Sequence, residues 1–210
     1  MQQPQLQFIV LTGGPGAGKT AVLEVMRHHF CKHVVILPEA ASIIFSGGFP
    51  RRDRQSARCA IQRAVFRVQV ELERLARDED DVGVVLCDRG TLDGLGYWPG
   101  SGESFFSDNE TSLERELSRY SAVIHMRTPP KNGGYNHHNP MRTESADEAA
   151  TLDARIAEAW SQHQNRTFVE NEPLFIAKLH HVVDALHAAM PNCCTTSLQW
   201  RALGRLSRAS

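Results

Sequence analysis

The stretch Leu11-Thr12-Gly13-Gly14-Pro15-Gly16-Ala17-Gly18-Lys19-Thr20 decides the fold of this chain. It follows the apolar run Phe8-Ile9-Val10-Leu11, and a helical pattern opens at Ala21. From Gly13 onward the residues satisfy the pattern G-x-x-x-x-G-K-[ST], which is typical of a phosphate-binding loop between a strand and a helix. Because the required strand and helix flank the pattern, we interpret this stretch as such a loop.

The residue types in this loop suit the chemistry of a nucleotide. Glycines allow positive φ and a close approach of the backbone to an anion. The backbone N–H groups and the start of the helix near Gly18 then face the β-phosphate. Lys19 is predicted to bridge the β- and γ-phosphates and Thr20 to coordinate Mg²⁺. The predicted nucleotide-binding residues are Gly13, Gly14, Pro15, Gly16, Ala17, Gly18, Lys19 and Thr20.

Length and charge limit the classes of protein to consider. The 210 residues suit one α/β domain, which we place at residues 1–190, with a tail at 191–210 to which the sequence assigns no role. The formal net charge is −1, from 23 Lys and Arg against 24 Asp and Glu, so we expect no nucleic-acid partner. The chain has neither an apolar run of about 18 residues nor a signal-peptide pattern, so we expect no membrane span and no export by a signal peptide.

Cysteines and histidines indicate a reducing location rather than a disulfide framework. The cysteines are scattered and form no C-x-x-C pair, which favours a cytoplasmic protein. They are Cys31, Cys59, Cys87, Cys193 and Cys194. His28, His29, Lys32 and His33 crowd the end of the first predicted helix, where the helix dipole favours cations. We interpret this cluster as a solvated helix end rather than a metal site.

Strand and helix patterns alternate along the chain. Five short apolar runs read as strands, and the intervening segments have helical spacing. This order predicts one parallel sheet of five strands, covered by helices on both faces and connected by right-handed crossovers. The predicted strands are 8–11, 34–37, 82–88, 122–126 and 167–169. The last helix is expected to be capped by Asn171-Glu172-Pro173 and to bury a stripe that includes Phe175.

Acidic residues follow two of the predicted strands. Glu39 comes just after 34–37, and Asp88 ends the apolar run 82–88 with Arg89 next to it. Ligands of open α/β sheets bind outside the carboxyl ends of the strands, so both carboxylates are functional candidates. With the phosphate loop, Asp88 reads as a Walker-B-like residue that holds Mg²⁺ directly or through water, so Thr20 and Asp88 are the predicted metal ligands.

Two segments are candidates for the second substrate. Arg51, Arg52 and Gln62 lie in or beyond the loop after Glu39 and are placed to reach a substrate. The segment 91–100 mixes aromatic residues with glycine, and the pattern fits a pocket wall and an ordinary packed loop equally.

A long irregular stretch runs from Thr128 to Thr143. Loops of this length in compact domains are often functional, and we interpret this one as a mobile lid. Arg127 precedes the stretch and Arg142 lies within it. Together with Arg89, these two arginines are predicted to neutralise charge on a transferring phosphoryl group.

Four stretches together resemble a known family. The phosphate loop, Pro38-Glu39-Ala40-Ala41, Cys87-Asp88-Arg89-Gly90 with Asp93-Gly94, and Asn139-Pro140-Met141-Arg142-Thr143-Glu144 are similar to the AAA-type ATPase-like P-loop domain of the NadR/TTD family, over about residues 6–187. More distantly, the Glu after the second strand and the Asp-Arg after the third are similar to deoxynucleoside and thymidylate kinases. The resemblance implies a nucleoside-kinase-like fold. It also implies small-molecule phosphorylation in the nicotinamide-riboside kinase relatives, and guanine-nucleotide and lipid binding in an animal branch.

Two functions from different classes fit these residues. In the first, the protein is an ATP-dependent kinase for a small-molecule or nucleoside-like hydroxyl. Lys19, Thr20 and Asp88 hold MgATP, with GTP left open as the nucleotide, and Glu39 accepts the acceptor's proton. In the second, it is a nucleotide-dependent switch that binds a protein or lipid partner without transfer. The chain lacks the Asn-Lys-x-Asp motif of signalling GTPases. This absence favours the kinase.

Overall fold

The computed structural model describes residues 6–129, 145–191 and 194. Its centre is a parallel five-stranded sheet with the strand order β2-β3-β1-β4-β5. The strands are β1 (Gln7–Thr12), β2 (Val34–Leu37), β3 (Val84–Asp88), β4 (Ala122–Met126) and β5 (Arg166–Val169). The predicted α/β class, the five strands and their parallel arrangement are confirmed.

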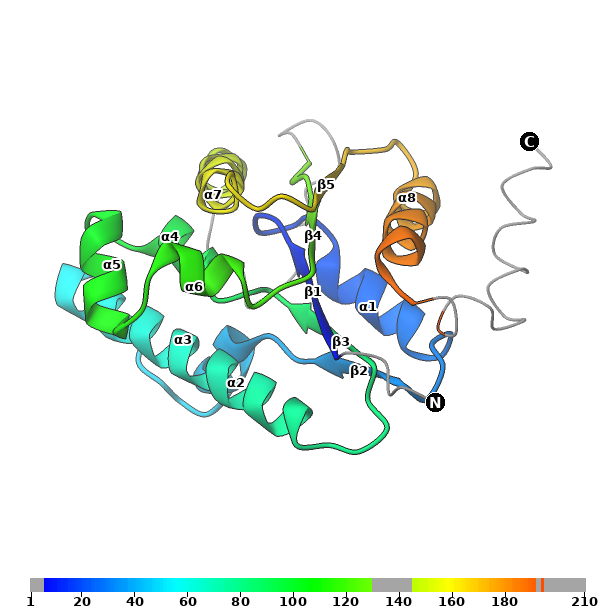
Figure 1. The fold of residues 1–210 in the computed structure, drawn as a ribbon. Coiled ribbons are helices and arrows are strands. Elements are labelled where there is room, and N and C mark those ends of the chain that lie inside the picture. The colour runs from blue at the N-terminus through cyan, green and yellow to red at the C-terminus, as the bar shows by residue number, and fades with distance from the viewer. Residues whose placement is uncertain (1–5, 130–144, 192–193, 195–210) are drawn as a thin grey trace.

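Helices cover both faces of this sheet (Figure 1). On one face lie α1 and α8, and on the other lie α3, α4, α6 and α7, with α2 and α5 packed beside them. The described helices are α1 (Lys19–Arg27), α2 (Ala40–Ser46), α3 (Gln55–Arg77), α4 (Asp93–Tyr97), α5 (Gly102–Asn109), α6 (Leu113–Leu117), α7 (Ala146–Ala159) and α8 (Phe175–Ala189).

The central strand β1 contributes side chains to both halves of the core, because its side chains alternate between the two faces of the sheet. Ile9 and Leu11 pack with α1 and α8, whereas Phe8 and Val10 pack with α3 and α7. All four side chains are buried, as expected for a parallel strand between two helical layers. At about 1.5–3 kcal/mol for each buried aliphatic or aromatic side chain, this alternation is a major source of stability.

Strand register brings the predicted functional residues to one edge of the sheet. Leu11 of β1 is paired with Asp88 of β3, and Cys87 of β3 is paired with Leu37 of β2. The phosphate loop, Asp88 and Glu39 therefore leave the carboxyl ends of three adjacent strands together. Proteins with open α/β sheets bind ligands at this edge.

The start of the last helix differs from the prediction. The predicted cap Asn171-Glu172-Pro173 is wrong, because α8 begins at Phe175 with Leu174 as its N-cap residue. The amide of Asn171 instead donates to the carbonyl of Thr128 at 2.8 Å, which anchors the loop after β4. Phe175 was expected in the buried stripe but is 45% exposed.

Among the residues that the structure describes, none of the helices has the length and apolar character needed to cross a membrane.

Candidate nucleotide and phosphoryl-transfer site

The phosphate loop has the conformation that its glycines permit. Gly13 and Gly18 have φ values of 132° and 93°, in the region that side chains rarely adopt. A Cβ at Gly13 would lie 2.0 Å from the carbonyl oxygen of Met126, so no larger residue fits there. Gly18 is the N-cap of α1, and the helix starts at Lys19 with its free N–H groups at the loop. This is the anion-binding geometry that the motif predicts.

Lys19 is held inside the loop. Its ammonium donates to the carbonyls of Gly13 at 2.9 Å and Gly14 at 3.2 Å, and the residue is only 7% exposed. Burial, helped by the nearby positive charge of Arg89, lowers the pKa of Lys19 from 10.5 to about 8. The nearby carboxylates therefore do not compensate the ammonium fully for its lost hydration, and the negative charge of a bound phosphate would stabilise its charged form.

Thr20 and Asp88 form the set of oxygen ligands expected for Mg²⁺. The Thr20 hydroxyl donates to Oδ2 of Asp88 at 3.2 Å. The other oxygen, Oδ1, is buried and has no hydrogen-bond partner among the described residues. Burial raises the pKa of Asp88 above its ordinary value, although the charge of Lys19 opposes the change. A cation would satisfy the unpaired oxygen, and hydroxyl and carboxylate oxygens are ligands that Mg²⁺ accepts.

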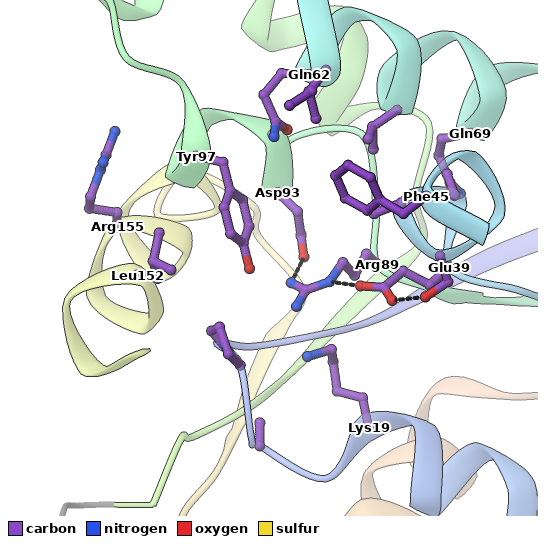
Figure 2. A pocket seen from close by; sticks show the side chains of 18 of the residues that line it. Lys19, Glu39, Phe45, Gln62, Gln69, Arg89, Asp93, Tyr97, Leu152 and Arg155 are labelled. Atoms are coloured by element: carbon purple, nitrogen blue, oxygen red, sulfur yellow. Dashed lines mark hydrogen bonds and ion pairs between the residues drawn. The ribbon is translucent and has the colours of Figure 1, made fainter. Parts of the chain in front are cut away.

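Arg89 joins two carboxylates beside the loop (Figure 2). Its Nε donates to Oε1 of Glu39 at 2.6 Å, and its Nη1 donates to Oδ2 of Asp93 at 3.0 Å and to the Gly13 carbonyl at 3.1 Å. Arg89 has a φ of 76°, which is uncommon outside glycine. Such backbone strain concentrates at functional sites, and the guanidinium here reaches the phosphate loop at the Gly13 carbonyl.

Glu39 is ionised at neutral pH in this arrangement. Burial alone would raise its pKa, but the charge of Arg89 and a 2.5 Å hydrogen bond from the Ser42 hydroxyl outweigh burial and lower the pKa of Glu39 to about 2. Its carboxylate borders the cavity, at the point where α2 begins. It can accept a hydrogen bond from a ligand hydroxyl.

A cavity of about 1030 Å³ extends from the phosphate loop past Glu39. Figure 2 shows Lys19 on one side of it, with Tyr97 and Gln62 across from Lys19. The predicted substrate candidates Arg51, Arg52 and Gln62 all line it. Its walls come from the loop, α2, α3, α4 and α7, and other residues that line it include Phe45, Arg58, Phe66, Gln69, Arg89, Asp93, Tyr97, Leu152 and Arg155.

Of the two alternatives for the segment 91–100, the structure favours the pocket wall. Its middle part, Asp93–Tyr97, forms α4, and Thr91, Asp93, Gly94 and Tyr97 line the cavity. Asp93 had no predicted role. It is buried and accepts hydrogen bonds from Thr12, Arg89 and the indole of Trp160. An Asp four residues after Arg89 was the available signal for this ion pair, but the pattern 93–97 is too short and rich in glycine to predict a helix.

The environment of Arg127 differs from the one predicted. Its guanidinium donates to Oδ2 of Asp153 at 3.2 Å and lies over the ring of Phe168, and it is not among the residues that line the cavity. The strand β4 ends at Met126, so Arg127 leaves the sheet toward β5 and α7. The structure therefore gives no support to its predicted contact with phosphate. Arg142 and most of the predicted lid lie outside the described residues.

Asp153, which the sequence did not single out, ties the phosphate loop to α7. Its Oδ1 accepts from the Gly14 N–H at 2.8 Å and lies 2.9 Å from Nε2 of His125. Burial would raise the pKa of Asp153, but the hydrogen bonds from His125, Gly14 and Arg127 hold it below its ordinary value. The carboxylate fixes the first turn of the loop.

The strand order, the loop and the carboxylates at the strand ends define a P-loop nucleotide-binding fold of the kinase-like type. A family profile described as "AAA domain" matches residues 8–173, and the chain belongs to this family. Comparison with curated protein sequences finds no match.

Solved structures agree with this assignment of the fold. NadR in complex with NR superimposes with a TM-score of 0.62 and 15% identity over 87% of this chain and 51% of NadR. NadR with NAD and AMP-PNP gives a TM-score of 0.59 at 14% identity, over 87% of this chain and 49% of NadR. The M. mycoides deoxyadenosine kinase with bound dATP gives 0.59 at 13% identity, over 86% of this chain and 99% of the kinase. The chain thus spans about half the length of NadR, and at these identities the likeness concerns the fold.

Proposed function

We propose that the protein is a Mg²⁺-dependent kinase that transfers the γ-phosphoryl group of ATP to a hydroxyl of a small molecule or nucleoside. The observation that carries this proposal is a single cavity that contains the phosphate loop at one end and an ionised, partly exposed carboxylate, Glu39, beyond it. A protein that only binds nucleotide has no need of the additional space lined by α2, α3 and α4. The kinase-like neighbours bound to AMP-PNP and dATP agree with this reading.

The loop end of the cavity would hold the triphosphate. The N–H groups of the loop and Lys19 bind the β- and γ-phosphates in this proposal, and Thr20 and Asp88 hold the Mg²⁺. The bound Mg²⁺ supplies charge neutralisation on the phosphate oxygens. Lys19 exchanges its contacts with the loop carbonyls for phosphate oxygens, whose negative charge raises the pKa of the ammonium again.

The other end would hold the acceptor. Glu39 accepts a hydrogen bond from the acceptor hydroxyl and takes its proton as the phosphoryl group is transferred. With a pKa of about 2 it is a weak base, so it first orients the hydroxyl oxygen toward the γ-phosphate and takes the proton only as that oxygen bonds to phosphorus and becomes acidic. Arg89 fixes this orientation through its bond to Glu39. It also lies near enough to the loop to neutralise charge on the transferring group.

Arg142 enters the proposal on the basis of the sequence alone. An arginine that approaches phosphate only when a lid closes stabilises the transition state more than the ground state and contributes about 10³- to 10⁵-fold in rate. We also place the protein in a reducing, cytoplasmic setting. This proposal rests on the scattered cysteines of the sequence, which form no C-x-x-C pair.

The experiment has two stages. Mass spectrometry of nucleosides, vitamins and small alcohols incubated with the protein and MgATP or MgGTP identifies an acceptor by the added phosphoryl mass. Single-turnover transfer is then measured in Glu39→Gln and in the control Glu170→Gln, whose side chain is 71% exposed. Glu39→Gln should lower transfer by about 10²- to 10⁴-fold with unchanged nucleotide affinity, and the control should match the wild type.

Arginine variants extend the test. Arg142→Ala should depress transfer and spare nucleotide binding, while Arg74→Ala, at a side chain that is 66% exposed, should change neither. Unaltered transfer in both Glu39→Gln and Arg142→Ala would overturn the kinase mechanism. Slow nucleotide hydrolysis that neither variant changes, with no acceptor phosphorylated, would favour a nucleotide-dependent switch.

A further inference from the structure

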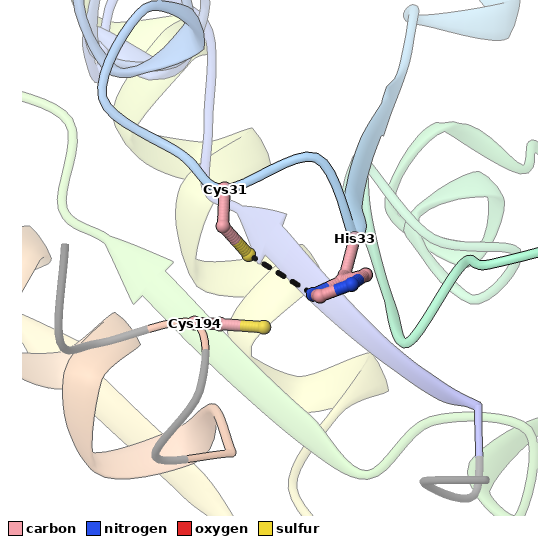
Figure 3. Close-up of side chains that lie close together, drawn as sticks. All are labelled: Cys31, His33 and Cys194. Carbon is pink, nitrogen blue, oxygen red and sulfur yellow. Dashed lines mark hydrogen bonds between the residues drawn. The ribbon is translucent and has the colours of Figure 1, made fainter.

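Two cysteines and a histidine meet at the edge of the sheet opposite the phosphate loop (Figure 3). Cys31 and His33 lie between α1 and β2, and Cys194 follows the end of α8. The Sγ of Cys31 is 3.7 Å from Nδ1 of His33, and the ligand atoms of all three residues lie within 4.8 Å of one another. More than 160 residues of sequence separate Cys194 from the other two.

This spacing is close to that of ligands on one tetrahedral ion. With Zn–S of about 2.3 Å and Zn–N of about 2.0–2.1 Å, a sulfur and a nitrogen on the same Zn²⁺ are about 3.6 Å apart, and two sulfurs are about 3.8 Å apart. The observed pair of Cys31 and His33 meets this value. The remaining separations, at 4.8 Å or less, need a movement of about 1 Å at most.

The backbone holds two of the ligands in place. The carbonyl of His33 accepts from the N–H groups of Gly83 at 2.9 Å and Val84 at 3.0 Å, and the carbonyl of Cys31 accepts from the Val34 N–H at 3.1 Å. Because β2 begins at Val34, the turn that carries Cys31 and His33 is anchored to the sheet. A metal would find these two side chains already oriented.

The three side chains differ in burial. Cys194 has no exposed surface and belongs to the apolar core between α1, α8 and the sheet, while Cys31 and His33 are half-buried. The cluster is therefore sheltered on the Cys194 side and open on the His33 side, which leaves room for water or another group as a fourth ligand.

We propose that Cys31, His33 and Cys194 bind one Zn²⁺. Thiolate and imidazole ligands select zinc over Mg²⁺, which prefers oxygen, so this site is distinct from that of Thr20 and Asp88. On binding, each cysteine thiol that coordinates the ion releases a proton to solvent. The ion joins the chain after α8 to the connection between α1 and β2, and acts as a structural crosslink. Of the clustered histidines near the end of α1, only His33 takes part.

The test uses the full chain, reduced and stripped of metal, with Co²⁺ as the first probe. One equivalent of Co²⁺ should give thiolate-to-cobalt charge-transfer absorption in the near ultraviolet and the visible bands of a tetrahedral complex. One equivalent of Zn²⁺ should abolish both signals, and a large excess of Mg²⁺ should leave them unchanged. Competition with a chromogenic chelator then gives the Zn²⁺ affinity.

Substitutions separate this site from other thiols. Cys31→Ser, His33→Gln and Cys194→Ser should each weaken Zn²⁺ binding by more than about 100-fold, beyond what loss of a supporting residue causes. Cys59→Ser, which changes a half-buried cysteine on α3, should bind like the wild type. Cooperative thermal unfolding of each variant checks that it is folded.

Three outcomes would overturn the proposal. The first is the absence of a one-to-one cobalt spectrum in the folded wild type. The second is an equal loss of Zn²⁺ affinity in Cys59→Ser and in folded Cys31→Ser. The third is a Cys31–Cys194 disulfide in the protein as isolated, detected by non-reducing peptide mapping, with no Zn²⁺ bound after reduction.

Discussion

Replacing Lys19 with methionine should stabilise the protein without ligand and abolish its stabilisation by nucleotide. Methionine keeps much of the apolar stem and removes the charge. In the wild type that charge is buried, and burial lowers the pKa of Lys19 from 10.5 to about 8. At about 1.4 kcal/mol for each pKa unit, the charged form destabilises the folded state by about 3 kcal/mol at pH 7.

Lost hydrogen bonds offset part of this gain in the unfolding free energy of the variant. Lys19→Met loses the hydrogen bonds to the carbonyls of Gly13 and Gly14, each worth about 0.5–1.5 kcal/mol. The net gain is then about 1 kcal/mol, which raises Tm by about 2–4 °C for a chain of this size. In contrast, MgATP at 100 times its Kd adds about 2.7 kcal/mol to the wild type and nothing to the variant.

The pH dependence gives this prediction its sharpest check. Unfolded lysine keeps its proton until about pH 10.4, whereas folded Lys19 loses it near pH 8. The unfolded state therefore binds more protons between these values, and wild-type stability rises with pH across that window. The stability difference between Lys19→Met and the wild type should be full below pH 8 and shrink as the pH rises toward 10.5.

The assay is thermal unfolding in phosphate-free buffer at several pH values, with and without MgATP. Lys19→Ala serves as the truncated comparison and should also lose the nucleotide effect. A lower Tm for Lys19→Met at pH 7, or a stability difference that is independent of pH, would refute the reasoning from burial. A nucleotide shift equal to that of the wild type would refute the phosphate-loop assignment itself.

Three further changes test the metal site, the contact between the phosphate loop and α7, and a buried ion pair of α3. Asp88→Asn should remove most of the gain in nucleotide affinity that Mg²⁺ provides, measured by titration calorimetry with and without the ion. If the variant keeps the wild-type gain in affinity, Asp88 does not hold the ion. Asp153 has a lowered pKa, so its ionisation stabilises the protein above about pH 4 and this stability is lost as the pH falls. Asp153→Asn should flatten acid unfolding, and an unchanged acid profile would contradict the contacts described. Glu73 is fully buried against Arg119, and Glu73→Gln should lower the unfolding free energy in urea by about 3–5 kcal/mol. A loss below about 1 kcal/mol would show that this ion pair does not stabilise the fold.

The sequence predicts most of what lies at strand ends. The phosphate loop, Glu39 and Asp88 each follow an apolar run, and parallel pairing places them together without knowledge of any side-chain contact. The edge position of β2 was harder to predict. Its run Val34–Leu37 is as apolar as a strand buried on both sides, but three of its four residues are half-buried because β2 pairs with β3 alone. Apolar composition does not distinguish the two positions.

Residues that depend on tertiary contact could not be predicted from the sequence. Asp153 lies within an ordinary amphipathic helix, and its role follows from the approach of α7 to Gly14. Cys31 and Cys194 are brought together only when α1 and α8 pack on the same face of the sheet. Arg127 comes directly after the apolar strand β4, much as Asp88 closes β3, yet its neighbours on β5 and α7 give it different partners.

The hydrogen bond from Gly14 to Asp153 couples the phosphate loop to α7. Two residues further along α7, Arg155 donates to the carbonyl of Trp98, just beyond α4. One helix is thus bonded both to the phosphate loop and to the segment that follows Tyr97. Because Asp153 and Arg155 lie two residues apart in α7, a displacement of the loop that moves Asp153 is expected to move Arg155 with it. The phosphate loop and the segment after α4 are therefore held in register by a single turn of one helix.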